Sequence, residues 1–293
     1  MTVHSISNAK NAKSSSAAVR VMAMGKPGSG KTTQFLTLPG RKFAYLFDPN
    51  SLQSLQGFDL DYEEFLPEDI KLGLTSLKKE LAEKERIKNK RDKHAGSELY
   101  RDWEADYEDK LASGFFNQYD SIMFDSFTTL SDMVMDGIMS INGRAGQWPN
   151  VDDYGPQMLA LTKIIRSLTS MGKNVYVTAH TKMVQDEVTK KIVNEPLMTG
   201  QLKSKLPLLF SELLVFSAAG DTKGNVNFLV QTRPDRYNET CRASLRKCNM
   251  FEDVTIDWDE AEKKGSAEGQ GLGLLYKDNF KIGKEEEGGK NSE

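Results

Sequence analysis

A glycine-rich segment that ends in a lysine and two threonines carries the clearest chemistry of the sequence. It reads GKPGSGKTT and satisfies G-x-x-x-x-G-K-[ST], in which glycines let backbone N–H groups turn toward phosphate oxygens. The start of a following helix would add the positive end of its dipole. At this spacing Lys31 would contact the β- and γ-phosphates of a nucleoside triphosphate, and the Thr32 hydroxyl would take one Mg²⁺ position. We therefore predict binding of ATP and Mg²⁺, while the choice between ATP and GTP stays open. The residues expected at the nucleotide are Gly25, Lys26, Pro27, Gly28, Ser29, Gly30, Lys31, Thr32 and Thr33.

An acidic residue closes the apolar run SIMFD at Asp125. Ligands of open α/β sheets bind at the carboxyl ends of strands, so this carboxylate would hold Mg²⁺ and its water shell. The alternative is that Asp125 caps a helix beginning near Phe127. In a third arrangement, Asp125 binds the metal and Ser126 caps the helix.

A third candidate lies at the end of the run NVYVTAH, where Thr178 and His180 are polar. A histidine at the end of a core strand is placed to sense a γ-phosphate. Taken alone, a histidine is better explained as a structural side chain, and the place of His180 at the end of the third core strand makes the two interpretations equal.

Apolar runs that alternate with helical patterns would position these residues. We expect helices from Phe127 to Ile141 and from Gln157 to Met171, the second with Gly172 as its C-terminal cap. This alternation predicts the α/β class, with a mostly parallel sheet covered by helices on both faces. The runs are Val19 to Met24, Lys42 to Phe47, Ser121 to Phe124, Asn174 to Ala179, Glu212 to Phe216 and Asn225 to Gln231.

Composition divides the chain into one principal domain with polar ends. Residues 1–17 and 262–293 lack apolar periodicity, which predicts flexible tails around a core at 18–261. Within the core, residues 60–117 are strongly charged and are predicted to form a helical insertion. From Lys78 to Lys93 there are eight Lys or Arg against four Asp or Glu. This stretch is either a solvated helix face with i,i+4 charge pairs or a basic surface for DNA.

Overall composition excludes several classes of protein. No apolar run approaches the ~20 residues that span a bilayer, and the first residues lack the apolar stretch of a secretory signal, so we expect a cytoplasmic protein. Cys241 and Cys248 lack CxxC spacing and nearby histidines, which argues against a zinc site or a disulfide framework. The net charge of −3 gives no global attraction to nucleic acid, although a local basic strip can still bind phosphates.

Four segments resemble, in their order along the chain, the phage-type RecA-like ATPases of the Sak4 group. These segments are GKPGSGKTTQFLTLPG, KFAYLFD, SIMFDS and NVYVTAH, and the resemblance covers about residues 19–245. It implies a trimmed RecA/Rad51 core that oligomerises with nucleotide at subunit interfaces. It further implies binding of single-stranded DNA, phage recombination by single-strand annealing, a location in the host cytoplasm and a single-strand-binding protein as partner.

The resemblance also assigns residues beyond the nucleotide loop. It extends to EPLMTGQLKSKLP and TRPDRYNETCRAS, where Arg242 matches a basic residue that reaches a neighbouring subunit's nucleotide, with Arg233 and Arg236 as competitors. The family usually carries a glutamate past the second strand to orient the attacking water, whereas this chain has Asn50 there. Asp48 would serve as the base if its loop brings it close, and otherwise turnover should be slow.

Two loops of RecA-like folds face a DNA channel, and here they correspond to residues 142–154 and 182–201. An arginine and a tryptophan in the first would supply a phosphate partner and a stacking face, and lysines punctuate a predicted hairpin in the second. The alternative is that the tryptophan packs its loop and the lysines are solvated. The predicted DNA contacts are Arg144, Trp148, Lys182, Lys190 and Lys191.

Three functions are compatible with these features. The leading hypothesis is an ATPase that controls its grip on single-stranded DNA through its nucleotide state. A nucleotide-dependent binding or scaffold module with little hydrolysis is the alternative, since Asn50 replaces the expected glutamate. A small-molecule kinase shares the phosphate-binding loop, but the sequence lacks the arginine-rich lid of short kinases.

Overall fold

A computed structural model describes residues 18–66 and 98–278, except positions 146, 186, 188–189, 199–201, 221 and 223. The predicted tail at 1–17, the basic stretch at 78–93 and residues 279–293 lie outside the described residues. No helix in the described part has the length and apolar character needed to cross a membrane.

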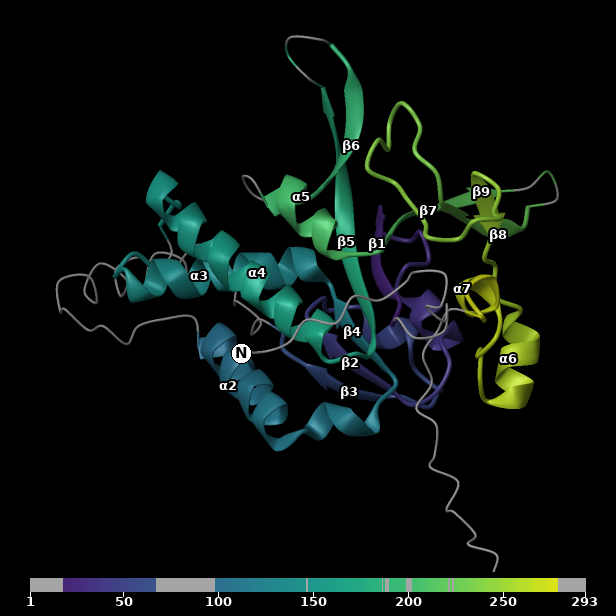
Figure 1. The fold of residues 1–293 in the computed structure, drawn as a ribbon, viewed down its shortest axis with the longest axis horizontal. Helices are drawn as coiled ribbons and strands as arrows, with labels where there is room; N and C mark the ends of the chain where they lie inside the picture. Colours follow the sequence, from purple (N-terminus) through teal and green to yellow (C-terminus); the bar gives the residue numbers. More distant parts are fainter. Residues whose placement is uncertain are drawn as a thin grey trace, which may run out of the picture.

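Nine strands of the described chain form one sheet in the order β3-β2-β4-β5-β1-β7-β8-β9, and β6 pairs with β5 (Figure 1). Neighbours from β3 to β7 are parallel, whereas β6, β8 and β9 pair in antiparallel fashion. All six predicted apolar runs are strands, and the predicted hairpin is formed by β5 and β6. The strands are β1 (Arg20–Gly25), β2 (Lys42–Leu46), β3 (Asp61–Glu64), β4 (Ser121–Asp125), β5 (Asn174–Gln185), β6 (Ile192–Pro196), β7 (Glu212–Gly220), β8 (Val226–Gln231) and β9 (Phe251–Asp253).

The parallel register brings the candidate residues to one edge of the sheet. Gly25 pairs with His180 across β1 and β5, and Leu46 pairs with Asp125 across β2 and β4. Because these strands run in one direction, the glycine-rich loop and Asp125 lie at the carboxyl ends of β1 and β4, level with His180 on the longer strand β5. With β5 inserted between the loop strand β1 and the acidic strand β4, the sheet has the RecA-like P-loop fold, which confirms the predicted fold class.

Helices cover both faces of the sheet (Figure 1). Side chains alternate along each strand, so Met22 packs into one core with α2, α3 and α4, whereas Val21 packs into a second core with η3, α6 and α7. The helices are α2 (Glu98–Ser113), α3 (Phe127–Ile141), α4 (Tyr154–Ser170), α5 (Leu202–Lys205), α6 (Trp258–Lys264) and α7 (Gly271–Leu275). The 3-10 segments are η3 (Thr33–Thr37), η4 (Leu52–Ser54), η5 (Phe115–Gln118), η6 (Val151–Asp153) and η7 (Leu206–Leu209).

Helix α3 begins and ends at the predicted residues, and its N-cap Ser126 accepts a hydrogen bond from the Thr129 amide. Helix α4 begins at Tyr154, earlier than predicted, and the predicted cap Gly172 follows it with φ +69°. Ser126 therefore caps the helix, which leaves the Asp125 carboxylate available to the site.

The segment after the glycine-rich loop is short, but η3 is a 3-10 helix and not an α-helix. Leu38 is extended, with φ −69° and ψ 149°, because Pro39 disfavours the helical conformation in the residue before it. The macrodipole of a long helix is thus absent behind this loop.

The segment predicted as a helical insertion contains helix α2, but it also contains a strand near its start that was not predicted. Residues 61–64 read DYEE and pair with β2 as the edge strand β3, where charged side chains remain exposed. Helix α2 buries Trp103 and Tyr107 against the sheet, with the two rings stacked at 5.3 Å between centroids. The helix therefore belongs to the core of the domain.

The prediction of a flexible tail from residue 262 is wrong for residues 262–278. There Gly265 caps α6 with φ +65°, and Leu272 on α7 and Tyr276 directly after it are completely buried. The Tyr276 hydroxyl donates to the buried Glu212 carboxylate on β7 at 2.6 Å. Few apolar residues are involved, but each contacts an element far away in the sequence, which local periodicity does not reveal.

Candidate nucleotide-binding site

The glycine-rich loop leaves β1 at Gly25 and enters η3 at Thr33. Gly28 and Gly30 have φ of +75° and +82°, a region that favours glycine. A Cβ atom on Gly30 would lie 2.7 Å from Cδ1 of Phe228 on β8. The turn therefore requires glycine both for its backbone conformation and for its contact with β8.

Lys31 lies buried at the base of this loop. Its ammonium donates to the carbonyl oxygens of Gly25 at 3.1 Å and Lys26 at 2.9 Å. Burial lowers the pKa of Lys31, and the nearby Asp125 and Asp48 carboxylates oppose this shift. A phosphate group in the cavity would offer the ammonium a charged acceptor, which forms stronger hydrogen bonds than a carbonyl.

Asp125 is buried beside Lys31 and accepts two threonine hydroxyls. The Thr32 hydroxyl donates to Oδ2 at 2.9 Å, and the Thr178 hydroxyl donates to Oδ1. Burial raises the pKa of Asp125, and hydrogen bonds from Thr178, Ser51 and Thr32 act in the opposite direction. The Thr32 hydroxyl and the Asp125 carboxylate are adjacent hard oxygen donors, which fits Mg²⁺ coordination. A bound cation would favour the ionised carboxylate.

Asp48 follows β2 and forms a second acidic position in the site. Its carboxylate lies 3.1 Å from Nε2 of His180 and accepts the Ser126 hydroxyl at 3.0 Å and the Thr129 hydroxyl. Burial alone would raise the pKa of Asp48, but these three hydrogen bonds outweigh it and lower the pKa. Asp48 is therefore an ionised carboxylate fixed by three neighbouring side chains at neutral pH.

These side chains border one cavity of about 360 Å³. The sequence identified its glycine-rich wall, both carboxylates and His180, and the structure brings them together. It missed Ser51, the N-cap of η4, and Ser54, the last residue of η4, which no motif marks. Asn50 also lines the cavity but is exposed. The lining residues are Pro27, Gly28, Ser29, Gly30, Lys31, Thr32, Thr33, Asp48, Pro49, Asn50, Ser51, Ser54, Asp125 and His180.

The arginine candidates lie in the segment between β8 and β9. The Arg242 guanidinium donates to the carbonyl oxygens of Pro207 at 3.0 Å and Phe210 at 2.7 Å. Arg233 donates to backbone carbonyls within its own segment. Arg236 is exposed, with its guanidinium carbon 4.4 Å from the centre of the Tyr237 ring. Arg236 and Arg242 are both exposed, whereas Arg233 is partly buried, and the role of Arg242 at a neighbouring subunit's nucleotide stays a prediction.

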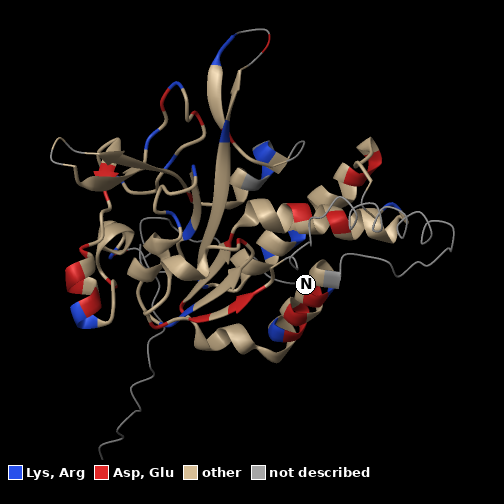
Figure 2. Cartoon of the chain, turned by 180° about the vertical axis from the view of Figure 1, so that it is seen from behind, with Lys and Arg blue, Asp and Glu red and all other residues tan. Residues whose placement is uncertain are grey.

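The DNA candidates differ in how they are held. Arg144 forms an ion pair with the buried Asp153, which fixes the loop after α3. The Trp148 side chain is 91% exposed, so it does not pack its own loop. The predicted lysines lie on or beside the hairpin that projects from the sheet in Figure 1, and Figure 2 shows basic residues on it. Lys182 and Lys190 are exposed.

Comparisons with known proteins gave one family match and several structural neighbours. No curated protein matches the chain. A KaiC-like protein from the hyperthermophilic archaeon Pyrococcus horikoshii OT3 is 12% identical with a TM-score of 0.41, covering 82% of this chain and 86% of that chain. The flagellar accessory protein FlaH from Methanocaldococcus jannaschii is 11% identical with a TM-score of 0.35, covering 82% and 87%. The model of the AAA_24 family, described as an AAA domain, matches residues 17–240. The chain belongs to this AAA domain family.

Proposed function

We propose that the protein is an ATPase that uses its nucleotide state to control binding of single-stranded DNA, as in the strand annealing of phage recombination. The arrangement of Lys31, Asp125 and Asp48 around one cavity supports the catalytic part. ATP would place its β- and γ-phosphates at the Lys31 ammonium and its Mg²⁺ at Thr32 and Asp125. Mg²⁺ neutralises the charge that develops on the phosphate oxygens.

In this proposal Asp48, which lines the cavity, orients the attacking water. The water oxygen attacks the γ-phosphorus, the bond to the β–γ bridging oxygen breaks, and the water proton passes to the phosphate or to Asp48. Because hydrogen bonds lower the pKa of Asp48, its carboxylate is a weak base that accepts a hydrogen bond from water. Lys31 stabilises the charge on the departing ADP.

A single continuous strand supports the link to DNA. Strand β5 begins in the core, passes the cavity at His180 and continues to Gln185 in the projecting hairpin, where it carries Lys182. A change at His180 would therefore act on the same strand that presents the hairpin lysine. Trp148 provides an exposed ring on which a base could stack, worth ~1 to 3 kcal/mol per base.

Fluorescence anisotropy of a labelled single-stranded oligonucleotide tests this proposal. At fixed moderate salt, we expect binding with ATP and Mg²⁺, weaker binding with ADP, and loss of the ATP effect in Lys31→Ala. Trp148→Ala and Lys182→Gln should each weaken binding. Lys173→Gln is the matched control, because Lys173 lies outside the hairpin, where its ammonium donates to the Asn117 carbonyl. No DNA binding in any nucleotide state would reject the DNA role.

The alternative is a nucleotide-dependent binding or scaffold module, favoured by the exposed Asn50 at the position where a glutamate is expected. Phosphate release with and without single-stranded DNA separates the two proposals. DNA-stimulated turnover supports the ATPase, whereas tight ATP binding without turnover supports the scaffold. Light scattering during ATP addition would test the assembly into oligomers that the RecA-like resemblance implies.

A further inference from the structure

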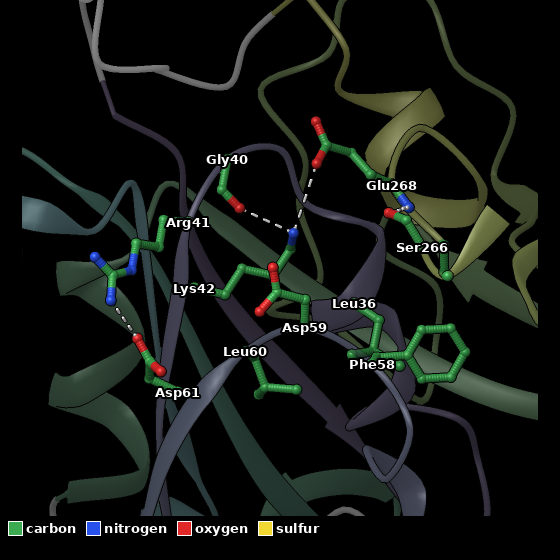
Figure 3. Close-up of a pocket in the computed structure, with 12 residues that line it drawn as sticks. Leu36, Gly40, Arg41, Lys42, Phe58, Asp59, Leu60, Asp61, Ser266 and Glu268 are labelled. Carbon is green, nitrogen blue, oxygen red and sulfur yellow. Dashed lines mark hydrogen bonds and ion pairs between the residues drawn. The ribbon is translucent and has the colours of Figure 1, made fainter.

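A second cavity, of about 480 Å³, is drawn in Figure 3. It is bordered by three segments: the end of η3 through the start of β2, residues 58–61 before and within β3, and residues 265–268 after α6. Lys42 is the first residue of β2, so the parallel strands place this cavity at their amino ends. It is therefore separate from the nucleotide site.

Lys42 supplies a buried cation to this cavity. Its side chain is 7% exposed, and its ammonium donates to the Gly40 carbonyl at 3.0 Å. The nearest carboxylate oxygen, on Glu268, lies 3.7 Å away, which is longer than a hydrogen bond. Burial lowers the pKa of Lys42, whereas Glu268 and Asp59 oppose this shift. A buried ammonium with one close acceptor among the described residues can accept a further anionic partner.

Of the other charged side chains of the cavity, two pair with each other and the Asp59 carboxylate is not part of that pair. Arg41 and Asp61 form an ion pair at 2.9 Å, and the Arg41 guanidinium also lies 4.9 Å from the centre of the Tyr119 ring. Asp59 lines the same cavity and forms no hydrogen bond or ion pair with another described residue. The cavity thus presents a buried cation whose ion-pair partner Glu268 lies at 3.7 Å, and an exposed Asp59 carboxylate that acts on Lys42 and Arg41 electrostatically without a hydrogen bond to a described residue.

Apolar side chains complete the lining. Leu36, Phe58 and Leu60 border the cavity, and Phe58 packs on Trp258 with 5.8 Å between ring centres. Figure 3 shows the three apolar side chains on one side of Lys42 and Glu268 on the other. A ligand that matches this lining has an anionic group for Lys42, a cationic group for Asp59 and a small apolar body.

We propose that this cavity binds a small zwitterion of the amino-acid type with an apolar side chain. Its carboxylate displaces Glu268 from Lys42, its ammonium pairs with Asp59, and its side chain packs on Leu36, Phe58 and Leu60. Leu36 belongs to η3, which follows the P-loop, so ligand and nucleotide share one element of the fold.

Isothermal titration calorimetry of the full chain with L-leucine and L-phenylalanine tests the proposal. We expect saturable binding, with affinity at least about tenfold weaker for 4-methylpentanoate, which lacks the ammonium, and for 3-methylbutylamine, which lacks the carboxylate. Inorganic phosphate tests the alternative of a simple anion site. Saturable phosphate binding at Lys42 with no binding of either amino acid would overturn the proposal.

Matched variants locate the site. Lys42→Met and Asp59→Asn should each weaken amino-acid binding at least about tenfold. Because Lys42 is buried and its replacement risks unfolding, the exposed Asp59 provides the decisive variant. Asp109→Asn, an exposed carboxylate on α2, and Lys31→Ala should leave binding unchanged. Absence of amino-acid binding, or binding that Asp59→Asn does not weaken, would refute the site, whatever the outcome at the P-loop.

Discussion

Nε2 of His180 lies 3.1 Å from Oδ2 of Asp48, which joins the middle of β5 to the segment after β2 at the nucleotide cavity. The two residues are 132 positions apart, and two strands of different segments must align to bring them together. The contact gives Asp48 a fixed orientation and gives the β5 strand a direct connection to a carboxylate of the site. ATP hydrolysis and the position of the β5–β6 hairpin would both depend on this contact between His180 and Asp48.

Asp48→Asn should lower the rate of ATP hydrolysis by at least about 100-fold, because an amide cannot orient water as a carboxylate does. ATP binding should stay within about threefold, since Lys31, Thr32 and Asp125 remain. Phosphate release and calorimetric titration measure the two effects. Asp102→Asn, an exposed carboxylate on α2, is the control. Hydrolysis by Asp48→Asn at the wild-type rate would remove Asp48 from the mechanism and direct attention to Asn50→Glu.

Asp125→Asn should separate folding stability from metal binding. Burial raises the pKa of Asp125, so a neutral amide removes a costly buried charge, and the nucleotide-free Tm should not fall. The additional Tm increase that Mg²⁺ gives in the presence of ATP should disappear, because a carboxylate ligand is lost. Thr32→Ser keeps the hydroxyl and should retain most of the Mg²⁺ effect. A Mg²⁺-dependent Tm increase that persists in Asp125→Asn would contradict this assignment.

Nucleotide affinity should depend on the protonation of Lys31. Burial lowers the pKa of Lys31 in the nucleotide-free protein, and bound phosphates would raise it again because they favour the ammonium. At a pH between these two pKa values of Lys31, nucleotide binding is therefore accompanied by uptake of a proton. ADP affinity should be constant below the lowered pKa and should fall, by up to about tenfold per pH unit, as pH rises through it.

Titrations of ADP from pH 7 to about 9.5 measure this effect. Lys31→Arg stays protonated throughout the range and should show a much flatter profile. The sign for folding is the opposite: the unfolded chain holds the proton more tightly, so stability rises with pH in the same window. Identical pH profiles for the two proteins would show that Lys31 does not titrate in the site.

The sequence predicted the parts of the site that local chemistry determines. The P-loop, Asp125 and His180 stand at the ends of apolar runs, and the parallel sheet brings those ends together. The hydrogen bonds around Asp48 depend on the register of β2 beside β4, which no local pattern encodes. Ser51 stayed unnoticed because a serine in a short 3-10 turn has no periodic signal.

Two segments of the fold, β3 and residues 262–278, differ from the prediction because long-range contacts determine them. Strand β3 is a charged edge strand, so it lacks the alternation of apolar residues on which strand prediction depends. The segment at 262–278 is polar and glycine-rich, and its stability comes from contacts with η3. The Gln34 side chain donates to the Val254 carbonyl at 2.6 Å and accepts from the Leu272 amide at 2.8 Å. These partners lie more than two hundred residues apart in the sequence.

Gly273→Ala tests whether α7 supports the P-loop. A Cβ atom on Gly273 would lie 1.9 Å from the Thr37 carbonyl oxygen, and the Gly273 amide donates to the Thr37 hydroxyl at 2.9 Å. The methyl group would therefore push α7 away from η3, at a cost of about 1 to 3 kcal/mol, which lowers the Tm by several degrees. ADP affinity should fall as well, because η3 begins at Thr33 of the loop. Gly155→Ala on α4, where a Cβ meets no atom within 4 Å, is the control and should lower neither the Tm nor the ADP affinity. If Gly273→Ala lowers the Tm but ADP affinity stays constant, α7 stabilises the fold without supporting the nucleotide site.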